Sequence, residues 1–303
     1  MDVFGTLQLG FVYAILALGV FITFRVMNTP DLTVDGSFTL GLAVSAVFTA
    51  DGRAGLGLLF GSICGALAGA VTGCLQTKAG IHPLLAGILT MTGLYSVNLL
   101  IMGGAPNISL LRETTVFSEL KRLFAGAGKD ATVLTAVVVL TLLCILGLGW
   151  FFHTGMGLCM RAAGDNPGMV RASSVNSDGV CILATALSNA FVGLSGAVLA
   201  QYQGYADINA GTGIVVVGLA SVIIGEVVIR RQSVWGGLLA AALGAIVYRF
   251  LIALALYMDF FPAYMLRLVS AVIVAVTLAI PKMREIAENA RVKREGRRNA
   301  ENA

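Results

Sequence analysis

The stretch Ala131–Phe152, ATVLTAVVVLTLLCILGLGWFF, decides the fold class of this chain. It contains no charged side chain, and a helix of about 20 apolar residues is long enough to cross the hydrocarbon core of a bilayer. A surface helix of a soluble protein would instead carry a single apolar stripe opposite a polar face. The stretch therefore predicts a membrane-spanning helix.

The composition of the whole chain agrees with this prediction. Of its 303 residues, 57% are hydrophobic and 12% are charged, and the mean hydropathy is +0.89. Soluble domains carry roughly 45–50% apolar and about 25% charged residues. Soluble enzymes, nucleic-acid-binding modules and disordered proteins are thereby excluded. The 5 cysteines form no metal-binding pair pattern, and we expect buried thiols rather than disulfides.

Nine apolar stretches follow one another along the chain. They run at Val3–Phe24, Gly36–Ala50, Ala54–Thr77, Pro83–Met102, Ala131–Phe152, Gly179–Gln201, Gly211–Gly225, Val234–Tyr257 and Tyr264–Ile280. The first has no preceding basic residue, so we interpret it as a retained span rather than a signal peptide. The sequence predicts an all-α polytopic bundle of about nine (8–10) spans over residues 1–281, followed by a basic tail at 282–303.

The basic residues predict which side of the membrane each loop faces. The tail after Pro281 is rich in Lys and Arg, and such segments stay on the cytoplasmic side. Counting spans backwards puts the N-terminus outside. The loop Gly103–Asp130 has charges of both signs, and an extra span there would change the count. We expect a multi-pass protein of the cell (plasma or inner) membrane with a cytoplasmic C-terminus.

Weak internal repeats relate the two halves of the chain. Gly41-Leu42-Ala43 recurs as Gly218-Leu219-Ala220, and Pro83 before one span recurs as Pro262 before another. The second and seventh stretches are short and contain glycine, which is typical of broken helices that line a cavity. With the predicted sidedness, matching spans run in opposite directions. This pattern indicates an inverted-topology repeat, which many transporters share.

The polar stretch Gly155–Asp178, GMGLCMRAAGDNPGMVRASSVNSD, is the most informative segment outside the spans. A short helix is expected over Gly157–Ala163, broken at Gly164. Asp165 or Asn166 then caps a second helix that has Pro167 in its first turn. By spacing alone, the segment also fits a well-capped cytoplasmic loop with topology-setting arginines.

The same segment carries a family resemblance. The string Arg161-Ala162-Ala163-Gly164-Asp165-Asn166-Pro167 resembles a motif of ABC importer permeases, in the branch that takes up branched-chain amino acids, ribose and nucleosides. Asn189–Gln201 and Gly211–Gly225 resemble two further helices of that family. Asn28–Phe38 resembles a subgroup with aromatic or uncharacterised amino-acid substrates.

The resemblance implies a function and a set of partners. Arg161–Pro167 and Arg171 would form the cytoplasmic element that couples the permease to ABC ATPase subunits. The chain would be the permease subunit of an importer for a small polar solute, an amino acid. Its partners would be the ATPase, an extracytoplasmic substrate-binding protein, a second and identical permease chain, and the lipid bilayer, with no nucleic acid. We expect no cofactor, metal or catalytic residue.

Four polar residues within or beside spans are candidates for the solute pathway. Asp35 either caps the second span or faces the pathway, and Asn98 and Asn189 either join helices or line it. Arg249 either marks a helix break or faces an inner cavity, where it would meet a substrate carboxylate or Asp35. Glu226 and Arg230 are spaced as an i,i+4 ion pair.

Two other possible functional motifs, a phosphate-binding loop and a protease motif, are incomplete. Gly126–Asp130 lacks the glycine and the Ser or Thr of a phosphate-binding loop. Gly193-Leu194-Ser195-Gly196 matches the rhomboid protease motif, but both histidines precede Ser195. We expect Gly193, Ser195, Gly196 and Gly218 to serve helix packing. The alternative function is a stand-alone secondary transporter with inverted repeats, which normally needs acids inside the membrane; no acid lies at the centre of a predicted span.

Overall fold

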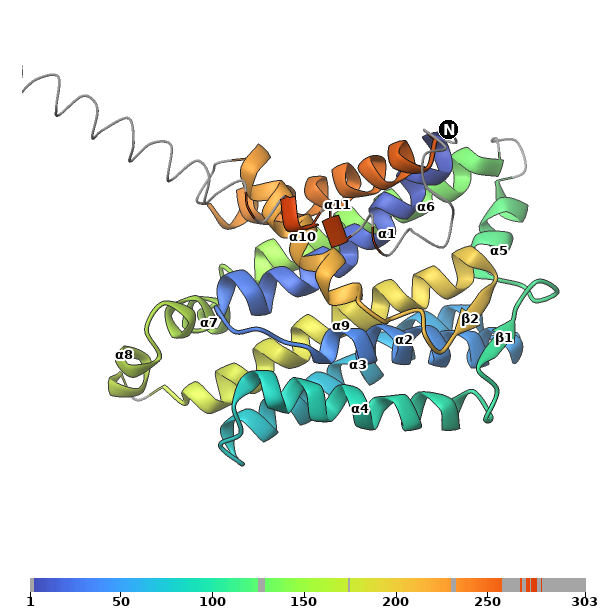
Figure 1. Cartoon of the computed structure of the whole chain (residues 1–303). Helices are drawn as coiled ribbons and strands as arrows, with labels where there is room; N and C mark the ends of the chain where they lie inside the picture. Colours follow the sequence, from blue (N-terminus) through green and yellow to red (C-terminus); the bar gives the residue numbers. More distant parts are fainter. Residues whose placement is uncertain are drawn as a thin grey trace, which may run out of the picture.

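The computed structural model describes residues 3–124, 129–173, 175–229 and 233–257, and single positions between 268 and 279. Within this part, seven helices are long and apolar enough to cross a membrane. They form an all-α bundle whose long axes run roughly parallel (Figure 1). The expected ninth span at Tyr264–Ile280 falls mostly outside the described residues, and the tail at 282–303 falls wholly outside them.

The described elements match eight of the predicted stretches. The seven long spans are α1 (Val3–Phe21) with its π-helical extension η1 (Ile22–Val26), α2 (Thr33–Ala50), α3 (Ala54–Thr77), α4 (Pro83–Ile101), α6 (Lys129–Phe151), α9 (Ser177–Gln203) and α11 (Val234–Tyr257). The eighth, α10 (Ile214–Val228), is shorter. Two short helices, α7 (Gly155–Asp165) and α8 (Pro167–Ala172), lie at one end of the bundle (Figure 1).

The opposite end contains structure that the sequence did not predict. β1 (Asn107–Ser109) and β2 (Tyr205–Asp207) pair as an antiparallel ribbon, with Ile108 opposite Ala206. The helix α5 (Val116–Leu123) lies beside them and is too short to span a bilayer. The amide of Val116 donates to Gln201 Oε1 at 3.0 Å, which ties α5 to the end of α9. The described part of the Gly103–Asp130 loop therefore holds no additional span.

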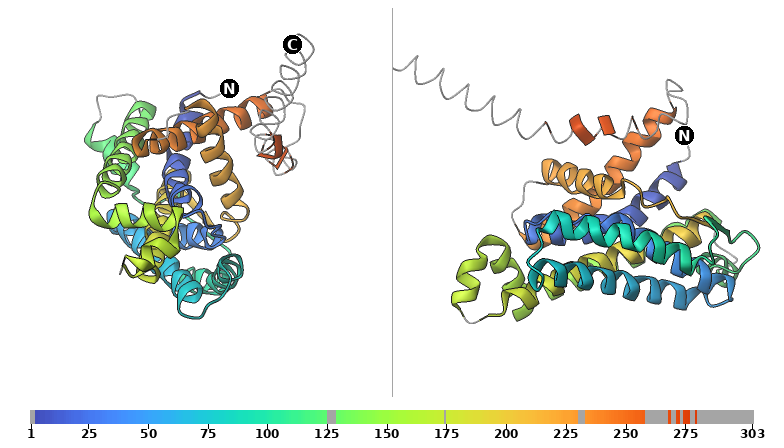
Figure 2. Two further views of the ribbon diagram at one scale, coloured as in Figure 1. Left: turned by 90° about the vertical axis from the view of Figure 1, so that its left-hand side faces the viewer. Right: turned by 60° about the horizontal axis from the view of Figure 1, so that its bottom comes forward.

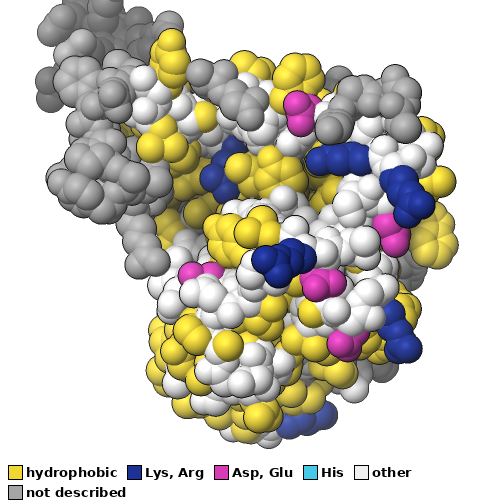
Figure 3. Space-filling model, turned by 90° about the vertical axis from the view of Figure 1, so that its right-hand side faces the viewer, with side chains coloured by type: hydrophobic (Ala, Val, Ile, Leu, Met, Phe, Trp, Pro, Cys, Tyr) yellow, Lys and Arg dark blue, Asp and Glu magenta, His cyan; other side chains and the backbone are white. Residues whose placement is uncertain are grey.

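Charges of both signs occur at this ribbon end of the molecule (Figure 3). Arg53, Arg112, Glu113 and Glu119 are all exposed there. The end with α7 and α8 carries exposed Arg25, Lys78 and Arg161 together with the exposed acid Asp165, so charges of both signs occur there too. The described charges therefore do not by themselves assign the two ends to the two sides of a membrane.

Glycines on one face of α3 allow its close approach to α9. Gly61, Gly65, Gly69 and Gly73 recur every fourth residue, so they share one side of the helix. A methyl group added at Gly65 would collide with the carbonyl oxygen of Asn189, and one added at Gly69 with that of Thr185. Small residues at such spacing are the usual means by which membrane helices pack closely. The second view in Figure 2 shows the bundle that results.

The first helix forms the centre of the core. Every residue from Val12 to Thr23 is buried, and α6, α9, α10 and α11 all contact this helix. Ser195 Oγ of α9 donates to the Val12 carbonyl at 2.8 Å, and Ser188 Oγ donates to that of Gly19 at 2.7 Å. A helix that is apolar on all sides can be buried in this way in a membrane bundle. Movement of α1 would therefore change its contacts with α6, α9, α10 and α11.

Two helices begin inside the bundle instead of at its ends. Leu32, just before α2, packs on Gly87, one turn inside α4, and Thr33 Oγ1 lies 2.7 Å from Thr72 Oγ1 of α3. The start of α10 is also buried and lies beside the start of α2, because Asp35 accepts hydrogen bonds from the amides of Gly213 and Val215. The short, glycine-containing stretches, predicted to be broken, are thus continuous helices whose starts lie inside the bundle.

The glycine face of α3 gives a first prediction. Gly65→Ala will lower the thermal unfolding temperature of the purified chain in detergent by several degrees, because overpacking costs about 1–3 kcal/mol. Gly55→Ala is the matched control: it lies on the same helix, and an added methyl there meets no atom within 4 Å. Replacing a helical glycine by alanine otherwise stabilises by about 0.5–1 kcal/mol. Equal melting temperatures for the two variants would show that this face does not set the packing.

Candidate functional site

The break between α7 and α8 comes from two neighbouring residues. α7 runs through Gly164 and ends at Asp165, whereas the sequence predicted a break at Gly164. Asn166 is extended, because the following Pro167 disfavours the helical conformation in the residue before it. Asn166 Oδ1 then accepts a hydrogen bond from the Met169 amide at 3.0 Å and caps α8. Asn166, rather than Asp165, is therefore the cap.

Gly164 attaches α7 to the first membrane helix. A methyl group added at this position would overlap the carbonyl oxygen of Val26, the last residue of η1. Met160 and Ala163 are buried on the same side of α7, while Arg161 and Asp165 are exposed. The glycine thus lets α7 lie directly against the backbone at the end of η1. A push from α7 at this contact would act directly on the backbone at the end of η1.

Arg171 attaches α8 to the bundle in a second way. Its Nε donates to Ser177 Oγ at 2.7 Å, and its NH2 group lies 3.3 Å from Asp178 Oδ1. Asp178 also faces Lys78 Nζ of the α3–α4 turn at 3.9 Å. These ion pairs are largely exposed and contribute little energy individually. They nevertheless hold α8 near the start of α9, so Arg171 is engaged within the chain.

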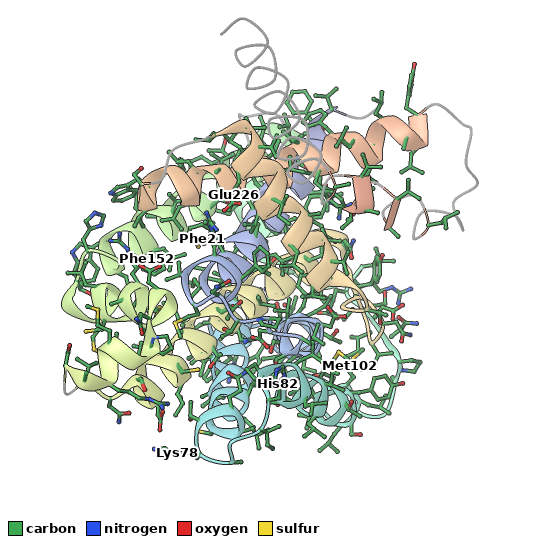
Figure 4. The ribbon with its side chains drawn as sticks, turned by 60° about the vertical axis from the view of Figure 1, so that its left-hand side comes forward. Phe21, Lys78, His82, Met102, Phe152 and Glu226 are labelled. Carbon is green, nitrogen blue, oxygen red and sulfur yellow. The ribbon has the colours of Figure 1, made fainter. Side chains whose placement is uncertain are left out.

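A cavity of about 680 Å³ lies between α7, the end of α10 and the start of α11. This is the side that the sequence predicts to face the cytoplasm. It is lined by Arg161 and Asp165 of the predicted coupling string and by Phe21, Arg25 and Glu226, among others. Figure 4 labels Phe21 and Glu226 close together, and it shows Lys78 and His82 of the α3–α4 turn well apart from them. Arg25 Nε lies 2.7 Å from Glu226 Oε1. Glu226 therefore pairs with Arg25; Arg230, its expected partner, is outside the described residues.

The four pathway candidates do not come together in one place. Asp35 and Asn98 line a second, smaller cavity of about 160 Å³ between α2, α4 and the segment before α10. Asn189 is buried and donates through Nδ2 to Asp31 Oδ2 at 2.7 Å and to the Thr185 carbonyl at 2.9 Å. Arg249 lies in an unbroken α11 with its guanidinium 3.8 Å from the Tyr13 ring centre, and it does not meet Asp35.

Asp31 is a polar residue that the site prediction left out. It is 5% exposed, and its Oδ1 accepts from the Thr33 amide at 2.9 Å. Together with the bond from Asn189, this fixes the start of α2 against α9. An acid thus does lie inside the bundle, although none lies at the centre of a span. The polar string between the first two apolar stretches was the only sequence signal for it.

The four residues assigned to helix packing all lie at close contacts. Ser195 bonds to α1, and Gly193 faces the Gly61 carbonyl of α3. A methyl added at Gly196 would overlap the Phe38 carbonyl of α2, and one at Gly218 would crowd Val20. These positions therefore lie where helices approach most closely. Among the described residues, no group of three His, Cys, Asp or Glu side chains is arranged to hold a metal ion.

Comparison with known proteins assigns the family. A model of the family described as "Branched-chain amino acid transport system / permease component" matches residues 3–280. The tyrosine transport system permease protein of Clostridioides difficile is 34% identical over 269 residues, which is 88% of this chain and 87% of that protein. The ribose import permease of Escherichia coli is 26% identical over 253 residues, 82% of this chain and 76% of that protein.

A further relative is named for a different cargo. The autoinducer 2 import system permease of Yersinia pseudotuberculosis is 28% identical over 225 residues, covering 73% of this chain and 61% of that protein. No solved structure matches this chain significantly. The family match covers every described span together with the α7–α8 element. The chain therefore belongs to the family of permease components of branched-chain amino acid transport systems.

Proposed function

We propose that this chain is the membrane-embedded permease subunit of an ABC importer for an amino acid, driven through α7 and α8 by ATPase subunits. The observation that carries the proposal is the seating of Gly164 on the Val26 carbonyl. A permease has no energy source of its own, so force from a partner must enter through a protruding element. The tyrosine permease relative supports an amino acid as the solute.

The described contacts supply a route for that force into the membrane. From Val26 the chain runs through residues 27–32, where Asn28 has a φ of +53° and the Thr29 amide bonds to the Thr23 carbonyl at 3.0 Å. Asp31 then anchors the segment to α9, and Asp35 joins α2 to the start of α10. Binding of ATP would bias a pre-existing equilibrium between inward-open and outward-open states along this route.

The finer architecture is part of the proposal. The interior starts of α2 and α10 support an inverted-topology repeat, since such repeats place broken helices at their interface. We also propose that Tyr264–Ile280 forms a ninth span and that the tail at 282–303 lies in the cytoplasm. Two identical chains would face each other on two ATPase subunits and receive solute from an extracytoplasmic binding protein. Asp35 and Asn98 would line the pathway.

A stand-alone carrier is not favoured. The family consists of permease components of transport systems. The buried acid that a proton- or ion-coupled carrier would use, Asp31, has hydrogen-bond donors on both oxygens: the Thr33 amide and the Asn189 side chain. These bonds account for Asp31 as a structural group at the start of α2.

The coupling role predicts that charge reversal at the exposed Asp165 abolishes transport. In vesicles that contain the permease, its ATPase and its binding protein, Asp165→Lys should lower ATP-driven amino-acid uptake at least about tenfold, because a misplaced charge at a docking surface costs several kcal/mol. Glu119→Lys is the matched control, since Glu119 is also an exposed acid and lies on α5 at the other end. A carrier that works alone would keep transporting with either change.

The sidedness gives a separate prediction. A thiol introduced by Ser109→Cys in β1 should react with a membrane-impermeant reagent in intact cells, because the ribbon end would face outward. A thiol introduced by Ser173→Cys, just after α8, should react only after permeabilisation. Both serines are exposed. Labelling at the modified peptide is measured by mass spectrometry. The reverse labelling pattern would show that the chain has the opposite orientation in the membrane.

A further inference from the structure

The smaller cavity lies where two helix starts meet inside the bundle. Asp35 and Thr39 of α2 line it, together with Thr92, Tyr95 and Asn98 of α4 and Thr212 before α10. Its volume of about 160 Å³ is near that of a cavity known to hold a benzene-sized molecule, about 150 Å³. Asp35 is the only charged residue among the described residues that line it.

Three of the side chains that line this cavity already donate hydrogen bonds within the chain. Thr92 Oγ1 donates to the Ile88 carbonyl at 2.8 Å, and Thr39 Oγ1 donates to that of Asp35 at 3.1 Å. Asn98 Nδ2 donates to the Gly36 carbonyl at 3.2 Å. A hydroxyl that has given up its proton can still accept, and an ionised carboxylate offers about four acceptor positions. Asp35, Thr39, Thr92 and Asn98 therefore offer mainly acceptors to a solute, while the hydroxyls of Tyr95 and Thr212 can donate or accept.

Asn98 Oδ1 is an unused acceptor. The residue is 1% exposed, and Oδ1 has no hydrogen-bond partner within the described part of the chain. Leaving such a group unpaired costs free energy, because its contact with water has been lost. An incoming hydrogen-bond donor would remove that cost.

The adjoining face of α4 is polar in the middle of a span. Thr92 and Ser96 are exposed there, and Tyr95 is 52% exposed, although the flanking residues Leu89 and Leu100 are apolar. Polar side chains in mid-membrane normally face a water-filled path or another chain rather than lipid. The cavity thus opens on a surface that suits a solute pathway.

We propose that this cavity is a solute subsite that binds a primary ammonium group. This subsite proposal rests on the proposed function, and it specifies which part of the solute the permease itself recognises. Three N–H donors of an ammonium match Asn98 Oδ1, the free acceptor positions of Asp35 and the threonine oxygens. The start of α10 offsets part of the Asp35 charge, so recognition rests on acceptor geometry more than on net charge.

The same acceptor groups would disfavour anions and would select between solutes. A carboxylate or sulfonate has only acceptors, so it could not bond to Asn98 Oδ1, and the ionised Asp35 carboxylate would repel it. A sugar hydroxyl supplies one donor at each oxygen and no positive charge, so it makes weaker bonds to Asp35. The amino group would therefore distinguish amino acids from sugars at this point of the pathway.

Two reagents of similar size test this chemistry without knowledge of the solute. 2-Aminoethyl methanethiosulfonate carries an ammonium, and 2-sulfonatoethyl methanethiosulfonate carries a sulfonate. Each is reacted with the full-length chain, assembled with its ATPase, bearing Thr92→Cys, and the modified peptide is followed by mass spectrometry. Thr135→Cys is the matched control: Thr135 is exposed on α6, bonds to the Ala131 carbonyl at 2.8 Å, and lies outside the cavity.

The proposal expects the ammonium-to-sulfonate rate ratio at Thr92→Cys to exceed that at Thr135→Cys by about tenfold or more. Adding Asn98→Leu should reduce the excess at least threefold. If that variant fails to fold, protection of the introduced thiol by tyramine but not by 3-(4-hydroxyphenyl)propionate gives the same test. Equal ratios, a sulfonate preference, or no reaction at Thr92→Cys would overturn the subsite. ATP-driven uptake is measured separately, so loss of uptake identifies failure of the proposed function instead.

Discussion

The absence of water inside a bilayer is the constraint on which this structure depends. Every backbone amide in the hydrocarbon region needs a partner, so a helix can begin there only if its first amides are satisfied. The carboxylate of Asp35 meets this need for α10 by accepting from Gly213 and Val215, each at 2.8 Å. Because Asp35 itself lies in the first turn of α2, one side chain fixes two interior helix starts together. The smaller cavity adjoins this junction, and Asp35 is part of both.

The junction is connected to the α7–α8 end by a short and well-anchored route. Gly164 lies on the backbone at the end of η1, and only a few residues separate η1 from α2. Asp31 holds that connection against α9, whose close contact with α3 depends on glycines. A force applied at α7 therefore acts on two elements at once: the buried first helix and the junction at Asp35. A permease of this family needs this kind of linkage, because its energy comes from another subunit.

The sequence predicted the local features better than the contacts between distant segments. Apolar length located the spans. The short glycine-containing stretches around Gly41 and Gly218 predicted broken helices, whereas α2 and α10 are continuous and only their starts lie inside the bundle. The string around Pro167 predicted a capped break, although the break falls at Asn166 because the residue before a proline avoids the helical conformation. No periodicity reveals that Asp35 would bond to an amide in the other half of the chain, or that Arg249 would lie over Tyr13. The three-residue strand at Asn107–Ser109 is likewise too short to leave an alternating pattern.

The most direct test of the account is whether ATP changes the small cavity through Gly164. In the assembled complex, thiols introduced by Thr92→Cys and Thr212→Cys face the cavity from α4 and from the segment before α10. Their rate of cross-linking by a short bifunctional thiol reagent should change severalfold when ATP binds. Gly164→Ala, whose methyl would displace α7 from η1, should abolish this change, whereas Gly155→Ala, whose added methyl meets no atom within 4 Å, should preserve it. An ATP response that survives unchanged in Gly164→Ala would contradict the account.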